Sequence, residues 1–344
     1  AGGADSFNIL VPRSELAYNR YRARRSDLAL SQNDLLPLEG EHEGVQFGLH
    51  PAMSSLQQRF NAGQATMVTN VGPLVEPTTR AAIDAEAVTL PLGLFTHSDQ
   101  ILSWQTATPA NRAGTGFGGR LIDALPRANT GLALAGNISL SGNNSFQAGA
   151  ATGSYAISAN RGVQSITGFD NELFKRSFES FMADSSASTL QTVYRNKLQS
   201  AIDAGDVYSS ALSQATTLST PFAEDSFSSA MKRIAELASV HEQLGVSRQT
   251  FFVTFGGWDP HEDTLGQQAT MLPALDAGLG QFQLALEELG LSNQVTTLTI
   301  SDFGRTLTSN GRGSDHGWGG NACLLYTSDA ADEGLGVDLG GRRI

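Results

Sequence analysis

Cysteine is nearly absent from this chain, since Cys323 is the only one among 344 residues. A single cysteine excludes an intrachain disulfide and a thiolate metal cluster. Basic side chains are also scarce, with 22 lysines and arginines against 34 acidic residues and a net charge of −12. Such a chain lacks the positive charge that binds a phosphate backbone or an anionic lipid layer. We therefore expect neither nucleic acid nor a membrane surface as a partner.

Long hydrophobic runs are missing as well. No stretch reaches the roughly 18 consecutive apolar residues that a spanning helix needs, so no membrane span is expected. Disorder is excluded because 40% of the residues are hydrophobic, and the 37 glycines follow no collagen-like period. The length suits one large α/β domain or two ordinary ones.

The two ends of the chain are unusual. The sequence begins at Ala1 without methionine, so an initiator and an export signal are expected to have been removed or left out. Residues 323–344 continue none of the upstream patterns, and their first part resembles a translated sequencing adapter. We expect residues 1–322 to form the folded body, 323–344 to be a non-native tail, and both ends of the natural protein to be truncated here. A genuine flexible tail is the alternative.

Apolar patterns predict an α/β fold in the body. Residues 250–255 form a near-continuous apolar run, typical of a buried parallel strand, and residues 295–300 form the next strand. Between them, from about 264 to 289, leucine and phenylalanine recur every three, four or seven residues, which predicts a long helix. A strand, helix and strand of this length predict a right-handed βαβ unit. We expect a mostly parallel central sheet flanked by helices.

The remaining segments fit the same fold class. Residues 51–71 have the pattern of a helix followed by a strand. From about 110 to 165 the chain is rich in glycine, asparagine, serine and threonine, which predicts hairpins or irregular β structure, and residues 170–245 are mostly helical in pattern. We expect the stretch from about 130 to 215 to be an irregular β and helical insertion, suited to cover a site as a cap.

Side chains of the type that bind ligands follow the predicted strands. Residues 256–261 (GGWDPH) come after the first, 301–306 (SDFGRT) after the second, and 313–317 (GSDHG) lie shortly beyond. Ligands bind past the C-terminal ends of strands in open α/β sheets. Asp and His together suit a borderline divalent ion such as Zn²⁺ or Mn²⁺. Each motif alone is an ordinary turn, so the prediction of a metal site depends on their order in a chain with six histidines.

These motifs together resemble a known family. The bacterial exported family catalogued as domain of unknown function 1501 has similar C-terminal motifs, which here are residues 256–261, Leu275, Asp276, Phe282, 301–306, Asn310 and 315–317. The N-terminal half adds further similar motifs, at residues 2–8 (GGADSFN), 47–51 (FGLHP), 96–100 (THSDQ) and 118–121 (GGRL). The resemblance covers the body from end to end.

That family is similar to the alkaline phosphatase-like superfamily, which also holds arylsulfatases, nucleotide pyrophosphatases and cofactor-independent phosphoglycerate mutases. The resemblance implies an alkaline phosphatase-like fold with one or two divalent ions at strand ends. It implies Asp5 as the first metal-binding aspartate and Asp259 with His261 as the pair on one ion. It also implies Asp302 as the next metal ligand, and His316 with Asp315 as the last metal histidine or a leaving-group acid.

The resemblance also implies a hydroxyl nucleophile. Thr96, followed directly by His97, fits that position, and Ser98 is the alternative. A neutral hydroxyl is weak, so it needs a metal ion that lowers its pKa. A second ion or Arg305 would then hold the charge that develops on phosphorus or sulfur.

Two departures from the superfamily pattern leave the number of ions open. Asp302 is followed by Phe303 where the superfamily usually has histidine, and Asp259 is separated from His261 by one residue instead of three. We expect that one ion is lost or held differently.

Three functional hypotheses follow. The first is a metal-dependent hydrolase of phosphate or sulfate esters, small or polymeric, that acts in the periplasm or outside the cell, because the resemblance implies twin-arginine export. The second is an exported binding or surface-assembly protein with a degenerate site. The third, a metal-free Ser-His-Asp hydrolase built on Ser98 or Ser301, is the weakest because a Gly-x-Ser-x-Gly elbow is missing. The sequence does not indicate an oligomeric state.

Overall fold

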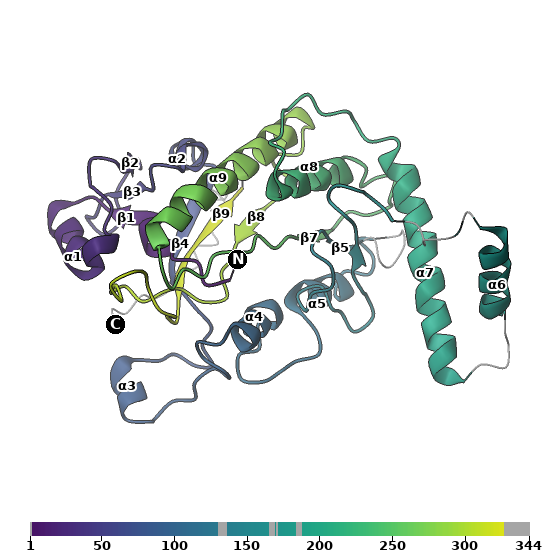
Figure 1. Cartoon of the computed structure of the whole chain (residues 1–344), viewed down its shortest axis with the longest axis horizontal. Helices are drawn as coiled ribbons and strands as arrows, with labels where there is room; N and C mark the ends of the chain where they lie inside the picture. The colour runs from purple at the N-terminus through teal and green to yellow at the C-terminus, as the bar shows by residue number, and fades with distance from the viewer. Residues whose placement is uncertain (1, 130–135, 165–168, 170, 184–187, 327–344) are drawn as a thin grey trace. The chain divides into compact units, whose positions relative to one another are not determined.

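The computed structural model of the chain describes residues 2–129, 136–164, 169, 171–183 and 188–326. The fold is mixed α/β, with helices and three small sheets (Figure 1). Contacts divide the chain into two compact units. Unit 1 comprises Ala1–Gly114, Leu218–Met231 and Thr254–Ile344, and unit 2 comprises Thr115–Thr217 and Lys232–Val253. The insertion predicted at about 130–215 falls within unit 2.

Unit 1 contains two antiparallel sheets of three strands. The first has the order β1-β3-β2 and is formed by β1 (Leu10–Pro12), β2 (Leu36–Pro37) and β3 (Phe47–Leu49). The second has the order β4-β9-β8 and is formed by β4 (Ala65–Val71), β8 (Thr297–Thr299) and β9 (Gly320–Leu325).

The helices of unit 1 are η1 (Ser6–Asn8), α1 (Glu15–Arg25), η2 (Ser26–Leu28), α2 (Ser54–Asn61), α3 (Arg80–Asp84), α4 (His97–Thr106) and α9 (Thr264–Glu288). The predicted long helix is therefore present as α9, and the apolar spacing buries Leu272, Leu279 and Leu286 on one side. From the same helix, the carboxylate of Asp276 accepts hydrogen bonds from the backbone N–H groups of Ser55 and Leu56 (both 2.8 Å). These bonds satisfy donors that the first turn of α2 leaves free.

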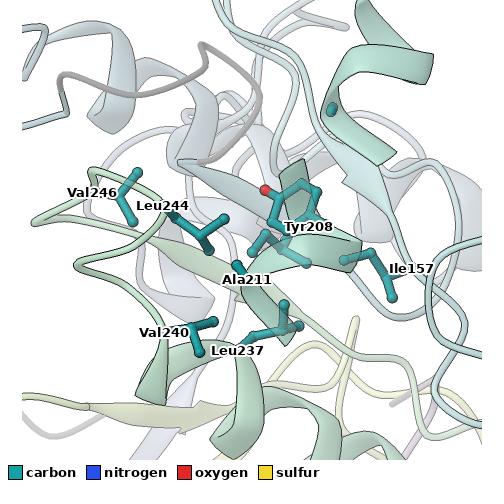
Figure 2. Close-up of a cluster of buried hydrophobic side chains, with 9 residues drawn as sticks. Ile157, Tyr208, Ala211, Leu237, Val240, Leu244 and Val246 are labelled. Carbon is teal, nitrogen blue, oxygen red and sulfur yellow. The ribbon is translucent and has the colours of Figure 1, made fainter. Parts of the chain in front are cut away.

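Unit 2 contains a parallel sheet in the order β6-β5-β7, formed by β5 (Asn137–Ser139), β6 (Tyr155–Ala156) and β7 (Thr250–Phe252). Its helices are α5 (Phe117–Asp123), α6 (Glu172–Ala183) and α7 (Thr189–Leu212), and α8 (Ser226–Ser239) has residues in both units. Buried side chains from β5, α7, α8 and the segments that follow β6 and α8 pack into one cluster with Tyr208 (Figure 2): Ile138, Ile157, Ala204, Ala211, Leu237, Val240, Leu244 and Val246.

The predicted βαβ unit is wrong in its pairing. β7 pairs in parallel with β5, whereas β8 pairs antiparallel with β9 in another sheet. Among the described residues, parallel pairing occurs only in the β6-β5-β7 sheet, so the expected mostly parallel central sheet is replaced by three small sheets of both kinds. The mixed α/β class itself is confirmed. The error arose because an apolar run locates a strand but does not specify the strand with which it pairs. In addition, β9, the partner of β8, includes residues 323–325, which were expected to belong to the tail.

Strand β9 extends past the boundary predicted after Ala322. Cys323, Leu324 and Leu325 pair with residues of β4 and β8, and the Cys323 and Leu325 side chains are buried. Burial raises the pKa of the Cys323 thiol to about 12. The first residues of the expected tail are therefore part of a sheet, and residues 327–344 lie outside the described part of the chain. None of the described helices has both the length and the apolar character needed to cross a membrane.

Candidate metal-binding site

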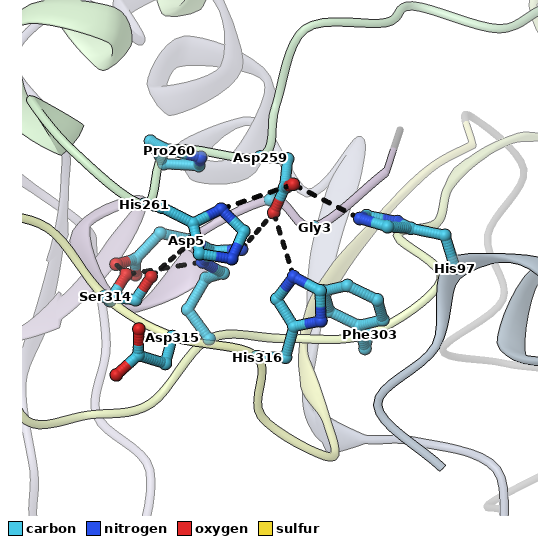
Figure 3. Close-up of polar contacts among 12 residues, drawn as sticks. Gly3, Asp5, His97, Asp259, Pro260, His261, Phe303, Ser314, Asp315 and His316 are labelled. Carbon is cyan, nitrogen blue, oxygen red and sulfur yellow. Dashed lines mark hydrogen bonds and ion pairs between the residues drawn. The ribbon is translucent and has the colours of Figure 1, made fainter. Parts of the chain in front are cut away.

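Three histidines from separate segments of unit 1 surround Asp259 (Figure 3). His97 begins α4, His261 lies in the loop before α9, and His316 lies in the loop before β9. The Asp259 carboxylate is 3.2 Å from Nε2 of His97, 3.3 Å from Nε2 of His316 and 3.4 Å from Nδ1 of His261. Ligand atoms of His97, Asp259 and His316 lie within 4.8 Å of one another, a spacing that could hold a metal ion.

His97 is oriented by Asp302. Nδ1 of His97 is 2.6 Å from Oδ2 of Asp302, whose side chain is almost fully buried. The other oxygen of Asp302 accepts the backbone N–H groups of Gly3 (2.6 Å) and Phe303 (2.9 Å). Because the carboxylate is an acceptor, we assign the His97 proton to Nδ1, which turns the lone pair of Nε2 toward Asp259. Metal-binding histidines commonly have this carboxylate support.

Burial opposes protonation of His97, but hydrogen bonds and charges from Asp302 and Asp259 outweigh burial and raise the pKa of the ring. A second proton on His97 would occupy Nε2, the atom that faces Asp259. Protons and a metal ion therefore compete for the same atom.

His316 has an unsatisfied ring nitrogen. Its Nδ1 is 2.7 Å from the carbonyl oxygen of Phe95, so Nδ1 carries the proton and Nε2 the lone pair. Nε2 is buried, has no hydrogen-bond partner, and faces the Oδ1 atom of Asp259 at 3.3 Å. A ring lone pair and a carboxylate oxygen repel each other at this distance, whereas a metal ion bound by both atoms, or a proton on Nε2, makes the contact attractive. The residues present thus fit a metal ion, with two imidazoles and one carboxylate as donors.

Arg305 pairs with Asp259 through Oδ1, the same oxygen that faces His316. The Arg305 side chain is fully buried, and its guanidinium group donates to Oδ1 of Asp259 and to the carbonyl oxygen of Ser314. Burial alone would raise the pKa of the Asp259 carboxyl group, but the charge of Arg305, together with His97 and His261, lowers it. Asp259 is therefore kept ionised, as a metal ligand must be.

Asp5 forms a buried ion pair with Arg25 and is linked to Arg305 through Ser314. Its Oδ2 atom is 2.7 Å from Nη2 of Arg25 and accepts a hydrogen bond from the Ser314 hydroxyl at 2.9 Å. The Asp5 and Arg25 side chains are completely buried. Oδ1 of Asp5 accepts the backbone N–H of Phe7. Both oxygens of Asp5 are thus engaged within the protein.

Comparison of the chain with protein-family models identifies its family. Residues 1–326 match the model described as "Protein of unknown function (DUF1501)". The chain belongs to the DUF1501 family. Searches of the curated proteins and of the solved structures gave no match. The family named from the sequence motifs is confirmed, and the likeness to the alkaline phosphatase-like superfamily stays a prediction.

The other site residues predicted from the DUF1501 resemblance have different surroundings. The Thr96 hydroxyl donates to the Gly93 carbonyl at 2.7 Å, and Ser98 is exposed in the first turn of α4. Asp315 is exposed and accepts a hydrogen bond from the Asn310 amide at 3.0 Å. Among the described contacts, none joins Thr96, Ser98 or Asp315 to Asp259.

The structure thus brings together most of the residues predicted for the DUF1501 site: His97, Asp259, His261, Asp302, Arg305 and His316. His97, which adjoins the predicted nucleophile, is one of the three residues that could hold a metal ion, and Asp302, implied as a metal ligand, contacts the His97 ring. Sequence reasoning missed Arg25, Ser314 and the Phe95 carbonyl. Ser314 lies inside the GSDHG motif, whereas no pattern around Arg25 distinguishes it from the other arginines of α1.

Proposed function

We propose that this DUF1501 protein binds one divalent metal ion through His97, Asp259 and His316 and uses it to hydrolyse phosphate or sulfate esters. The observation that carries the proposal is the buried Nε2 atom of His316. This atom has no hydrogen-bond partner and faces the Oδ1 atom of Asp259. A divalent ion between the two groups would satisfy both of them. Zn²⁺ and Mn²⁺ remain the proposed ions, since both accept imidazole and carboxylate ligands.

A single ion is favoured over two. Asp302 would have to release His97 to bind metal directly, and Asp5 would have to leave its buried pair with Arg25. The three proposed ligands have side chains that are 38%, 36% and 22% exposed, so solvent reaches the site. Three protein ligands with an accessible fourth position are typical of catalytic zinc sites, whereas structural zinc sites have four.

The charges suit an anionic substrate. Asp5, Asp259 and Asp302 with Arg25 and Arg305 leave one net negative charge in the described network. A divalent ion would change this to one net positive charge and attract a phosphate or sulfate group. When bound, such an ion would polarise the ester and lower the pKa of a nucleophilic hydroxyl or water.

Thr96 and Ser98 remain the proposed nucleophiles, because each adjoins His97 in sequence at the start of α4. Replacing Thr96 or Ser98 by alanine should leave metal binding intact and abolish turnover for whichever hydroxyl is used. If both variants still hydrolyse the ester, water is the nucleophile.

The test combines metal analysis with an ester screen. Protein purified without chelators is analysed by elemental mass spectrometry and titrated with Zn²⁺ and Mn²⁺, and its hydrolysis of p-nitrophenyl phosphate and p-nitrophenyl sulfate is followed. We expect about one ion per chain and none in His316→Ala, as the three-ligand site requires. His42→Ala is the matched control, because His42 is exposed. Metal binding without hydrolysis of any ester would support the proposed metal site and contradict the proposed hydrolase activity.

One observation favours a second candidate, an exported binding or surface-assembly protein with a degenerate site. Arg305 already pairs with Oδ1 of Asp259, so part of the carboxylate charge is offset without a metal ion. A folded protein with no metal above background would support this candidate. Action outside the cytoplasm belongs to both proposals, and fractionation of cells that produce the natural protein tests it.

A further inference from the structure

Gly3 lies next to two aspartates of the candidate site, Asp259 and Asp302 (Figure 3). Its backbone N–H donates to Oδ1 of Asp302 at 2.6 Å. A β-carbon built on Gly3 would lie 2.8 Å from Oδ1 of Asp259 and 3.3 Å from Nη1 of Arg305. Since the first distance is shorter than real β-carbons show, any other residue at this position must displace something. Gly3 also has φ +67°, a left-handed conformation that L-residues with side chains adopt rarely.

The atoms that a side chain at position 3 would meet have little freedom to move. Asp259 is held by the fully buried guanidinium group of Arg305, which is itself bonded to Ser314. Displacing the Asp259 carboxylate would therefore change its distance to His97 and His316, the partners with which it forms the candidate ligand set.

The hydrogen bond from the Gly3 N–H affects Asp302, the residue that orients His97. It fixes one oxygen of Asp302, and the other oxygen fixes the ring of His97. A change in the backbone at Gly3 would thus reach His97 through Asp302. Gly3 thus bonds to the carboxylate that orients His97 and, by lacking a side chain, leaves room for the carboxylate proposed as a ligand.

We propose that Gly3 is a positioning residue of the metal site, which sets Asp302 through its N–H and leaves room for Asp259 through its missing side chain. This inference rests on the proposed metal site. Gly3 touches no substrate in this account and acts only through the two aspartates.

Gly2 offers a matched control next to it in the chain. A β-carbon on Gly2 would lie 3.6 Å from Oδ2 of Asp302 and 3.6 Å from Nδ1 of His97, which is ordinary contact. Its φ lies outside the left-handed range, so alanine fits there without strain. Gly2→Ala therefore changes the same segment without disturbing the site.

The experiment measures Zn²⁺ affinity of the wild-type protein, Gly3→Ala and Gly2→Ala by competition titration, and records the visible spectrum of the Co²⁺ forms. We expect Gly3→Ala to weaken Zn²⁺ binding by about 10-fold to 100-fold, the usual cost of disturbing outer-shell support, and to change the Co²⁺ bands. Gly2→Ala should bind within about twofold of wild type, because it adds ordinary contacts alone. The Co²⁺ spectrum reports ligand geometry, which a general loss of stability would leave unchanged.

Wild-type affinity and spectrum in Gly3→Ala would overturn the inference while leaving the metal site in place. Absence of Zn²⁺ binding in the wild-type protein would instead overturn the proposed function, and the inference with it. Should Gly3→Ala fail to fold, the amide resonance of Gly3 in ¹⁵N-glycine-labelled wild-type protein decides. It should move on addition of Zn²⁺ while that of exposed Gly63 stays in place, and an unmoved Gly3 resonance would contradict the inference.

Discussion

His50 shows how its surroundings set the protonation of a single side chain. It is a histidine that the metal site does not use, and burial lowers its pKa to about 4. Its Nδ1 atom accepts the backbone N–H of Ala52 at 3.1 Å, a bond that a proton on Nδ1 would remove. The folded state therefore favours neutral His50.

This shift predicts a dependence of stability on pH. Between about pH 6.5 and pH 4 the unfolded chain binds a proton at His50 and the folded chain does not. The stabilisation from neutral His50 is thus complete above pH 6.5 and is lost as the pH falls toward 4. His50→Asn should flatten the decline in unfolding free energy by up to about 1.4 kcal/mol per pH unit.

Urea unfolding at pH 7, 6 and 5 measures this slope, with His42→Asn as the exposed control. An unchanged slope in His50→Asn would show that other groups cause the acid sensitivity.

At the residue scale, the sequence motifs predicted which residues lie close together, but not the contacts that orient them. Asp259, His261, Asp302 and His316 follow predicted strands, and the structure brings them together. The support of His97 depends on Asp302, which is 205 positions away in the chain. The support of His316 depends on the backbone of Phe95, a residue with φ 69°. Neither contact leaves a local pattern.

Among the elements, helix α9 meets α2 at a point where only glycine fits. A β-carbon on Gly280 would lie 2.8 Å from the Cβ and Oγ atoms of Ser55. Gly280→Ala should therefore lower the unfolding free energy by about 1–3 kcal/mol, as overpacking does, despite the better helix propensity of alanine. Denaturant unfolding measures the loss.

A second substitution tests the cause of that loss. Ser55→Gly removes the atoms that the new methyl group would meet, so the double variant should recover much of the difference between Gly280→Ala and wild type. Effects that simply add would show that the two helices do not clash at this point.

Strand β9 gives a second prediction at this scale. It lies between β4 and β8 and buries Cys323 and Leu325. A chain ended after Ala322 loses these pairings and should be less stable than a chain ended after Tyr326 by roughly 2–4 kcal/mol or more, from the lost Leu325 side chain alone. Thermal unfolding of the two truncated chains makes the comparison. Equal stability would instead support the folded-body boundary predicted after Ala322.

For the whole molecule, the mixed α/β class and the long helix α9 could be predicted because they depend on local apolar spacing. The sheets could not, because each joins distant segments. β5 pairs with β7 more than a hundred residues away, and β8 pairs with β9, part of which was expected to belong to a non-native tail because it resembles a translated adapter. The pairing of β8 with β9 was therefore not predicted.

The candidate site lies entirely within unit 1, although its residues come from both ends of that unit's sequence. His97 precedes the whole of unit 2 in the chain, and Asp259 and His316 follow it. Metal binding would therefore tie early and late segments of unit 1 together and stabilise the folded state by mass action.

The most direct test of the metal site is the Zn²⁺ stoichiometry of the folded wild-type protein, measured beside His316→Ala. A site with three protein ligands should bind about one ion per wild-type chain and none in the variant. Equal Zn²⁺ content in the two proteins, or a folded wild-type protein that binds no metal, would contradict the proposed site.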